Sequence, residues 1–478
     1  MWIVHLVSRE PATGVSMANQ TSTAGPAGSG NVLYRIPGVG FVLRLVGPAA
    51  LVAAGMIGAG AVATRLLAGA WFGFDLLWVA LYVVPMVIFT LDSASRVAML
   101  SGGRGMFEMI RTDIGAWLAW FIFIPTVLVN VVVNMSQASA MIEGAYGAMG
   151  QLPPAGAAQG PMFVAVSFGL VIITLLAAVF GGYKRVEKIM TALLMVILVS
   201  FIIVAVKGLL DWHTWPALAK GLVPTIPDPQ PVVGGAPGAA RDGFTQVMAI
   251  AGQALPPSVM LAYGYLAANS GQTVKDIKAA FRKTVQNLGV IWGLFSVVVI
   301  VAGATALHNV YTGSGPTYLG VSHYSQIESI PVAGQVLGPA FPGALSFLAP
   351  RFFSLGLVAA GFTTLISVSL TMTYFCLDMA RRDWHFTPSN KGFKWVFALW
   401  IAVPGLIAPF WQMPALLKAI LAMVGNLLLA PVSVAVIAYF VNQRFMGEYK
   451  ASTGRNVVLA ITGLFALALV ANGIRTLL

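Results

Sequence analysis

Charged residues are scarce in this chain. Only 9% of its 478 residues are Asp, Glu, Lys or Arg, while 58% are hydrophobic, and the mean hydropathy is +0.86. Soluble globular domains carry about a quarter charged residues, so this composition excludes that class. The chain is therefore expected to be an all-α integral membrane protein, with the lipid bilayer as a partner.

Cysteine is almost absent. The one cysteine, Cys376, excludes an intramolecular disulfide and a multi-cysteine metal site. The five histidines include no His-x-x-x-His pair, and nucleophile-elbow, Walker and zinc-protease signatures are lacking. We therefore expect no enzyme, no cofactor and no bound metal.

Long apolar runs dominate the rest of the chain, each near the ~20 residues needed to cross a membrane. The eleven predicted spans are 42–70, 76–100, 114–142, 161–181, 187–210, 244–268, 285–307, 352–380, 393–411, 414–441 and 455–475. Residues 1–40 are polar and rich in Gly, Ser, Thr and Ala, and are predicted to form a disordered tail.

The excess of 27 basic over 15 acidic residues gathers in alternate loops. "TVKDIKAAFRKT" and "ARRDWHFTPSNKGFK" are basic, whereas the loops at 143–160, 211–243 and 308–350 hold few basic residues. Basic loops stay in the cytoplasm, so the pattern predicts a multi-pass protein of the inner (plasma) membrane with a cytoplasmic N-terminus. This placement explains the charge without a nucleic-acid partner.

Four stretches of the chain are informative when taken together: "GPAALVAAGMIGAGAVATRLLAGAWFGFDLLW" (47–78), "GGYKRVEKIMTALLMVILVSF" (181–201), "GLVAAGFTTLISVSLT" (356–371) and "RFMGEYKASTGRNVVLAITGLFALALVANGI" (444–474). Together they resemble the natural resistance-associated macrophage protein (NRAMP) family of divalent metal transporters. The resemblance implies a LeuT-like fold in a transmembrane domain over 41–478. Two inverted five-helix repeats, about 41–210 and 244–441, would precede an extra helix at 455–475, with helices one and six broken at mid-membrane.

The sequence supports these breaks independently. Segments 42–70 and 244–268 hold corresponding places in the two halves, and Gly or Pro interrupts both. Paired interruptions of this kind point to the binding site of a transporter. Carried over by resemblance, the family's metal-binding and proton-coupling positions fall on Gly58 (Asp in the family), Ala61 (Asn), Pro256 (Met), Ser258 and Tyr263 (His), and Asn134 and Gln137 (acidic).

These substitutions remove the carboxylate, thioether and imidazole groups that transition metals prefer. Free backbone N–H groups at the broken helix ends would then favour a small anion, such as bicarbonate or a small carboxylate, carried by alternating access. The candidate site residues are Gly58, Ala59, Gly60, Ala61, Thr64, Arg65, Gln253, Pro256, Pro257, Ser258 and Asn426.

Charged groups inside the spans are few. Arg65 and Lys418 are predicted to make an outer vestibule positive. The alternatives are a structural partner for Arg65 and snorkelling of Lys418 to the membrane interface. Asp92 and Arg96, four residues apart, are predicted to form an ion pair on one helix face.

Three other functions stay open at this point. One is a transporter of Mg²⁺ or Mn²⁺ with a rebuilt site made of oxygen ligands only. Another is a carrier of a small neutral or zwitterionic solute, since Gly and Ala leave room for one. The third is a membrane sensor or scaffold that does not transport. The sequence leaves the coupling ion, the direction of flux and the oligomeric state undetermined.

Overall fold

The computed structural model is mostly helical. It describes residues 56–154, 160–179, 183–232, 240–269, 273–308, 317–318, 321–322, 327–341, 343–387 and 389–477. Within these ranges, nine helices are long and apolar enough to cross a membrane, or ten if the pair Leu193–Leu209 and Trp212–Lys220, bent by 90°, counts as one span. The predicted tail, 1–40, lies outside the described residues.

The long helices follow the apolar runs of the sequence. They are α3 (Ala59–Phe72), α4 (Leu77–Leu100), α6 (Ala116–Ala148), α7 (Pro161–Val179), α8 (Tyr183–Leu209), α10 (Gly243–Ala254), α11 (Pro257–Asn269), α13 (Gly293–Ala306), α16 (Leu348–Met379), α17 (Lys391–Ile407), α18 (Ala415–Val441) and α19 (Thr453–Leu477).

Short helices and turns of helix connect them. They are α5 (Met106–Met109), η2 (Ile110–Ile114), η4 (Trp212–Thr214), α9 (Trp215–Lys220), η5 (Val274–Asp276), α12 (Ile277–Thr284), η6 (Val285–Trp292), α15 (Ile330–Ala333), η8 (Gly334–Ala340), η9 (Gly343–Leu345), η10 (Ala408–Phe410) and η11 (Arg444–Tyr449). Two antiparallel pairs complete the described part: β1 (Gln230–Pro231) with β2 (Ala240–Arg241), and β3 (Thr317–Tyr318) with β4 (Val321–Ser322).

The first and sixth predicted spans are the ones that the structure changes most. Span 42–70 is described only from Met56 onward, and α3 is its second half. Span 244–268 consists of two helices, α10 and α11, that meet at Leu255 and Pro256. The division into two inverted repeats stays a prediction.

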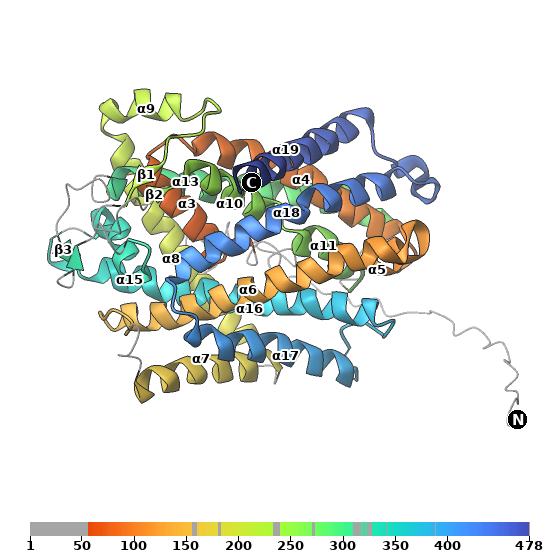
Figure 1. Cartoon of the computed structure of the whole chain (residues 1–478), viewed down its shortest axis with the longest axis horizontal. Helices are drawn as coiled ribbons and strands as arrows, with labels where there is room; N and C mark the ends of the chain where they lie inside the picture. The colour runs from red at the N-terminus through yellow and green to blue at the C-terminus, as the bar shows by residue number, and fades with distance from the viewer. Residues whose placement is uncertain are drawn as a thin grey trace, which may run out of the picture. The chain divides into compact units, whose positions relative to one another are not determined.

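Helix α3 lies in the middle of the packed helices, and all of its residues are buried. It packs against α13, α18 and α10, while α6 runs beside α16 and α7 beside α17 (Figure 1). Gly69 of α3 and Gly303 of α13 bring two backbones together: a Cβ on Gly69 would lie 2.7 Å from the Ala304 nitrogen. Small residues permit this close approach of membrane helices. This contact fixes α3 against α13.

Candidate functional site

The chain leaves helical geometry just before α3. Gly58 is extended (φ −87°, ψ −177°), and α3 begins at the next residue. Gly58 packs directly against α16, where a Cβ would lie 2.9 Å from the Thr364 Cβ and 3.0 Å from its Cγ2, with the hydroxyl closer still. Glycine is therefore required by space at this break.

The second break follows from proline chemistry. Helix α10 ends at Ala254, and Leu255 leaves the helical region (φ −118°, ψ 48°). Pro256 has no N–H to continue the helix, and Pro257 occupies the first position of α11, where proline is tolerated. The Pro256 carbonyl then accepts hydrogen bonds from the N–H groups of the new helix. The two prolines end one helix and start another.

A small cavity lies between the two breaks, and we call it the break cavity. Its volume is about 40 Å³, room for an ion or a few water molecules. Asp, Glu, Lys, Arg and His are all missing from its described lining. The lining residues are Met56, Gly58, Gly60, Ala61, Asn130, Val133, Gln137, Gln253, Pro256, Ser258, Val259, Thr364, Val368, Met423 and Asn426.

Two amide side chains of this cavity are oriented by hydrogen bonds that they donate to backbone carbonyls. Gln253 Nε2 donates to the Met56 carbonyl at 2.7 Å, and Asn130 Nδ2 donates to the Thr126 carbonyl at 2.7 Å. Since a carbonyl only accepts, these bonds identify the NH₂ end of each amide. Asn130 Oδ1 and Gln253 Oε1 are buried and accept no hydrogen bond from any described residue. The lining of the cavity thus contains two oxygen acceptors to which no described residue donates.

The predicted row of free backbone donors is largely used up. The Ala59 N–H donates to Gln137 Oε1 at 3.2 Å, and the N–H groups of Ala61 and Val62 donate to the Gly58 carbonyl at 3.0 and 3.1 Å. Of the residues from Met56 to Ala61, only Ile57 and Gly58 are non-helical, so most of "GAGA" is already helical. The expectation that this stretch presents free N–H groups is wrong for Ala59 and Ala61.

The structure brings seven of the predicted site residues together at one cavity. Gly58, Gly60, Ala61, Gln253, Pro256, Ser258 and Asn426 line the break cavity, whereas Ala59, Thr64, Arg65 and Pro257 are not among its lining residues. Thr64 Oγ1 donates to the Gly60 carbonyl, and Arg65 donates to Ser296 of α13. A role of all these residues in substrate binding stays a prediction.

Two methionines in the cavity were missed by the sequence analysis. Met56 precedes α3 and Met423 lies on α18, where Asn426 Nδ2 donates to its sulfur at 3.7 Å. The expectation that the site has no thioether is therefore wrong, because other elements supply two. Methionine in an apolar run is the ordinary filling of a core, so the sequence carried no signal for it.

Asn130 was also missed, although a signal existed. It lies one turn before Asn134 in a strongly apolar span, where a polar side chain is a suspect for function. Asn134 itself donates to Ser369 Oγ at 3.1 Å and to the Trp400 carbonyl at 3.0 Å. Asn134 and Gln137 are both buried and neutral, as the sequence requires.

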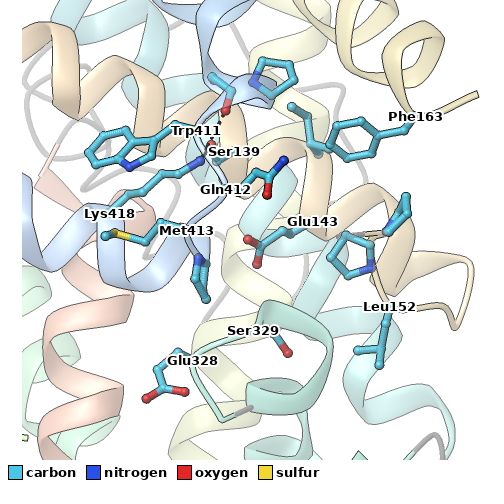
Figure 2. Close-up of a pocket in the computed structure, with 16 residues that line it drawn as sticks. Ser139, Glu143, Leu152, Phe163, Glu328, Ser329, Trp411, Gln412, Met413 and Lys418 are labelled. Atoms are coloured by element: carbon cyan, nitrogen blue, oxygen red, sulfur yellow. Dashed lines mark hydrogen bonds between the residues drawn. The ribbon is translucent and has the colours of Figure 1, made fainter. Parts of the chain in front are cut away.

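A larger pocket of about 400 Å³ lies further along α6 and α18, and we call it the Glu143 pocket. Figure 2 shows Glu143, Gln412 and Lys418 turned toward it. Glu143 accepts from the N–H of Ala415 at 2.6 Å and from that of Ile330 at 3.3 Å.

Lys418 crosses between the two helices that line this pocket. Its Nζ donates to Ser139 Oγ at 2.7 Å and to the Ala408 carbonyl at 3.3 Å, and the residue is buried. Glu143 and Glu328 share the lining with Lys418, whereas Arg65 is not part of it. Lys418 thus shares this lining with two carboxylates, and Arg65, at 0% exposure, lies elsewhere. A positive outer vestibule stays a prediction.

The predicted ion pair on α4 is confirmed. Arg96 Nε lies 2.7 Å from Asp92 Oδ2. Arg455 of α19 lies 2.6 Å from the same oxygen, a partner that the spacing of residues along α4 does not indicate. The buried carboxylate thus joins two helices.

Comparison with known proteins identifies the family. The family model described as "Natural resistance-associated macrophage protein-like" matches residues 49–476. The chain belongs to the Nramp family. Among curated Nramp relatives, the divalent metal cation transporter MntH of Yersinia enterocolitica is 25% identical over 440 residues, which cover 90% of this chain and 95% of that protein. MntH of Klebsiella pneumoniae is 27% identical over 68% of this chain and 69% of its own length.

Solved structures agree on the fold. A mutant of the manganese transporter of Eremococcus coleocola superposes with a TM-score of 0.64 at 16% identity, covering 95% of this chain and 89% of that one. MhsT in complex with L-phenylalanine gives a TM-score of 0.57 at 15% identity, over 88% of this chain and 96% of MhsT. The Nramp chain has the LeuT-like fold and is a multi-pass membrane transporter, as the sequence predicted.

Proposed function

We propose that this chain transports a divalent metal cation through the break cavity by alternating access. The observation that carries the proposal is the pair of unpartnered oxygens, Asn130 Oδ1 and Gln253 Oε1, in the lining of that cavity. A buried acceptor without a donor costs free energy, and a cation or a water molecule bound to it removes that cost. The names of the curated relatives, which are divalent metal cation transporters, support the same cargo.

The ligand types favour Mn²⁺, the less hard ion, over Mg²⁺. Amide and hydroxyl oxygens suit Mg²⁺, Ca²⁺ and Mn²⁺, whereas the thioethers of Met56 and Met423 suit softer ions. Mg²⁺ also keeps several of its water ligands when it binds to proteins. A cavity of about 40 Å³ has little room for the ion and these waters together. We therefore propose Mn²⁺ before Mg²⁺ as the cargo. A neutral ligand set holds the ion more weakly than a carboxylate would.

A small anion has the weaker support. The N–H groups of Ala59 and Ala61, which would bind it, already donate to Gln137 and to Gly58. Arg65 is not among the residues that line the break cavity. The uptake assay includes small anions, but few hydrogen-bond donors remain in the break cavity to bind one.

Uptake into proteoliposomes tests the proposal. The purified protein is reconstituted, and the entry of Mn²⁺, Mg²⁺, labelled bicarbonate and labelled acetate is followed against empty liposomes. We expect saturable Mn²⁺ uptake that exceeds Mg²⁺ uptake. Saturable bicarbonate or acetate uptake without Mn²⁺ uptake would overturn the cation proposal, and no flux of any solute would favour the non-transporting alternative.

Replacing Asn130 by aspartate should strengthen cation binding. The protonated Asp side chain can still donate to the Thr126 carbonyl, and binding of the metal releases that proton. The carboxylate then faces the ion, and we expect the apparent KM for Mn²⁺ to fall at least about tenfold, which corresponds to ~1.4 kcal/mol. The effect should grow as the pH rises, because less proton competes with the metal.

Two variants accompany this measurement. Asn130→Leu removes the oxygen and should lower Mn²⁺ uptake strongly, while Gln151→Leu replaces an exposed amide outside the cavity and should leave uptake unchanged. An Asn130→Asp protein that folds and binds Mn²⁺ no better than the original would contradict the assignment of this side chain to the cation site.

A further inference from the structure

Arg65 is a charged side chain enclosed in the middle of the bundle. Its exposed fraction is 0%. Its Nε donates to Ser296 Oγ at 2.8 Å, and its Nη1 donates to Thr64 Oγ1 at 2.9 Å and to the Ala61 carbonyl at 3.4 Å. All of these acceptors are neutral oxygens. Nη2 is buried and has no hydrogen-bond partner in the described ranges.

In the described part of the chain, no carboxylate lies beside the guanidinium. The chain has 15 acidic residues, and the side chains of all except Glu10 and Glu187 are described. None of those described lies within 4.0 Å of the Arg65 nitrogens, since every ion pair found joins other residues. An arginine inside a membrane protein normally pairs with a negative group, because a buried charge without a counter-charge is strongly destabilising.

The aromatic ring that the guanidinium contacts carries another donor without a partner among the described residues. Trp292, the last residue of η6, is fully buried, and its ring centroid is 4.9 Å from the Arg65 Cζ. The face of the indole contributes a favourable cation–π contact but no hydrogen-bond acceptor. The Trp292 Nε1 has no partner among the described residues. Two neighbouring side chains from α3 and η6 thus each carry a buried N–H that no described residue accepts.

We propose that Arg65 and Trp292 bind one small monovalent anion of the chloride class. Arg65 Nη2 and Trp292 Nε1 are the donors, and the single positive charge of Arg65 sets the charge of the anion. The anion must be small because every residue of α3 is buried. It supplies the counter-charge and the acceptor that the described residues do not provide there. The site is separate from the break cavity and does not depend on which solute is transported.

Thermal unfolding in detergent tests this site without any transport measurement. The protein is melted in sodium chloride, sodium bromide and sodium gluconate at constant ionic strength. We expect chloride and bromide to raise the melting temperature by several degrees over gluconate, with saturation, because binding to the folded state alone stabilises it. In Arg65→Gln the rise should vanish, and in Trp292→Phe it should need more chloride.

Arg241→Gln is the matched control, because Arg241 pairs with Glu328 and should have no need of a bound anion. That variant should keep the full response to chloride. Equal melting temperatures of the original protein in chloride and gluconate would overturn the proposal, as would a full response in Arg65→Gln. If Arg65→Gln does not fold, an unchanged chloride affinity in Trp292→Phe and Ser296→Ala decides against the site.

Discussion

Replacing Gly58 by alanine should reduce transport to below about a tenth of the original rate, since a displacement of ~1 Å in a site can cost far more than tenfold. The added Cβ would lie 2.9 Å from the Thr364 Cβ and closer still to its hydroxyl. Thr364 belongs to the long helix α16, which cannot give way locally. The chain at the break must move instead, and it takes with it the Met56 carbonyl that holds Gln253.

The effect should fall on the site more than on the fold. Overpacking of this kind costs about 1–3 kcal/mol, which a bundle of this size can tolerate. We therefore expect Gly58→Ala to be purified as a folded protein whose initial rate of Mn²⁺ uptake is low. The measurement is uptake into proteoliposomes, with the melting temperature as the check on folding.

Two further variants make this test specific. Gly58→Ala combined with Thr364→Ala removes the hydroxyl and methyl groups that crowd the new Cβ, and should recover part of the lost uptake. Gly169→Ala adds a Cβ on α7 where no atom lies within 4 Å, and should be silent. A fully active Gly58→Ala protein would show that the break does not need glycine.

Replacing Asp92 by asparagine should destabilise the folded protein by about 3–5 kcal/mol, the usual cost of leaving buried charges without their partner. Asp92 is 1% exposed and holds both Arg96 and Arg455 through one carboxylate oxygen. Arg455 also donates to Ser93 Oγ at 3.1 Å and stacks on Phe89. Without the carboxylate, two guanidinium groups face each other in a poorly solvated region.

Melting of the variant in detergent measures this loss, and Asp113→Asn is the control. Asp113 pairs with Arg104 through two hydrogen bonds of 3.0 and 2.9 Å, but both side chains are about one-third exposed. Such surface pairs contribute about 0–1 kcal/mol. The hydrogen bond from Arg104 lowers the pKa of Asp113. The small contribution of this pair to folding stability is therefore present at neutral pH and is lost as the pH falls through that lowered pKa.

Melting temperatures of Asp92→Asn and Asp113→Asn are therefore compared at neutral pH, where the carboxylate of Asp113 is ionised and its pair is formed. The double variant Asp92→Asn with Arg455→Met should recover part of the stability, because it also removes one of the stranded charges. If Asp92→Asn melts at the same temperature as Asp113→Asn, the buried cluster contributes no more than a surface pair, and this account of α4 and α19 is wrong.

Local chemistry made some features of the fold predictable. The long apolar runs predict the helices, and Gly58, Pro256 and Pro257 predict the breaks. Both features depend mainly on residues that are neighbours in the chain. The pair of Asp92 with Arg96 follows from helical periodicity. The third member, Arg455, comes from α19, and its approach is a matter of packing between helices that no local rule reaches.

The candidate site, too, was predictable in part from the sequence and in part only from the folded structure. The sequence by itself determined the membrane class, the two breaks, and the loss of carboxylate and imidazole from the family's ligand positions. Only the tertiary structure decided which polar atoms of the cavity are left over. The Ala59 donor is consumed by Gln137, 78 residues away, while the amide of Gln253 is turned by Met56, 197 residues away, so that its oxygen is left without a partner. Hydrogen bonds between segments far apart in the sequence form only when the chain folds. The polar groups that these bonds leave without a partner then determine which ligand the cavity prefers.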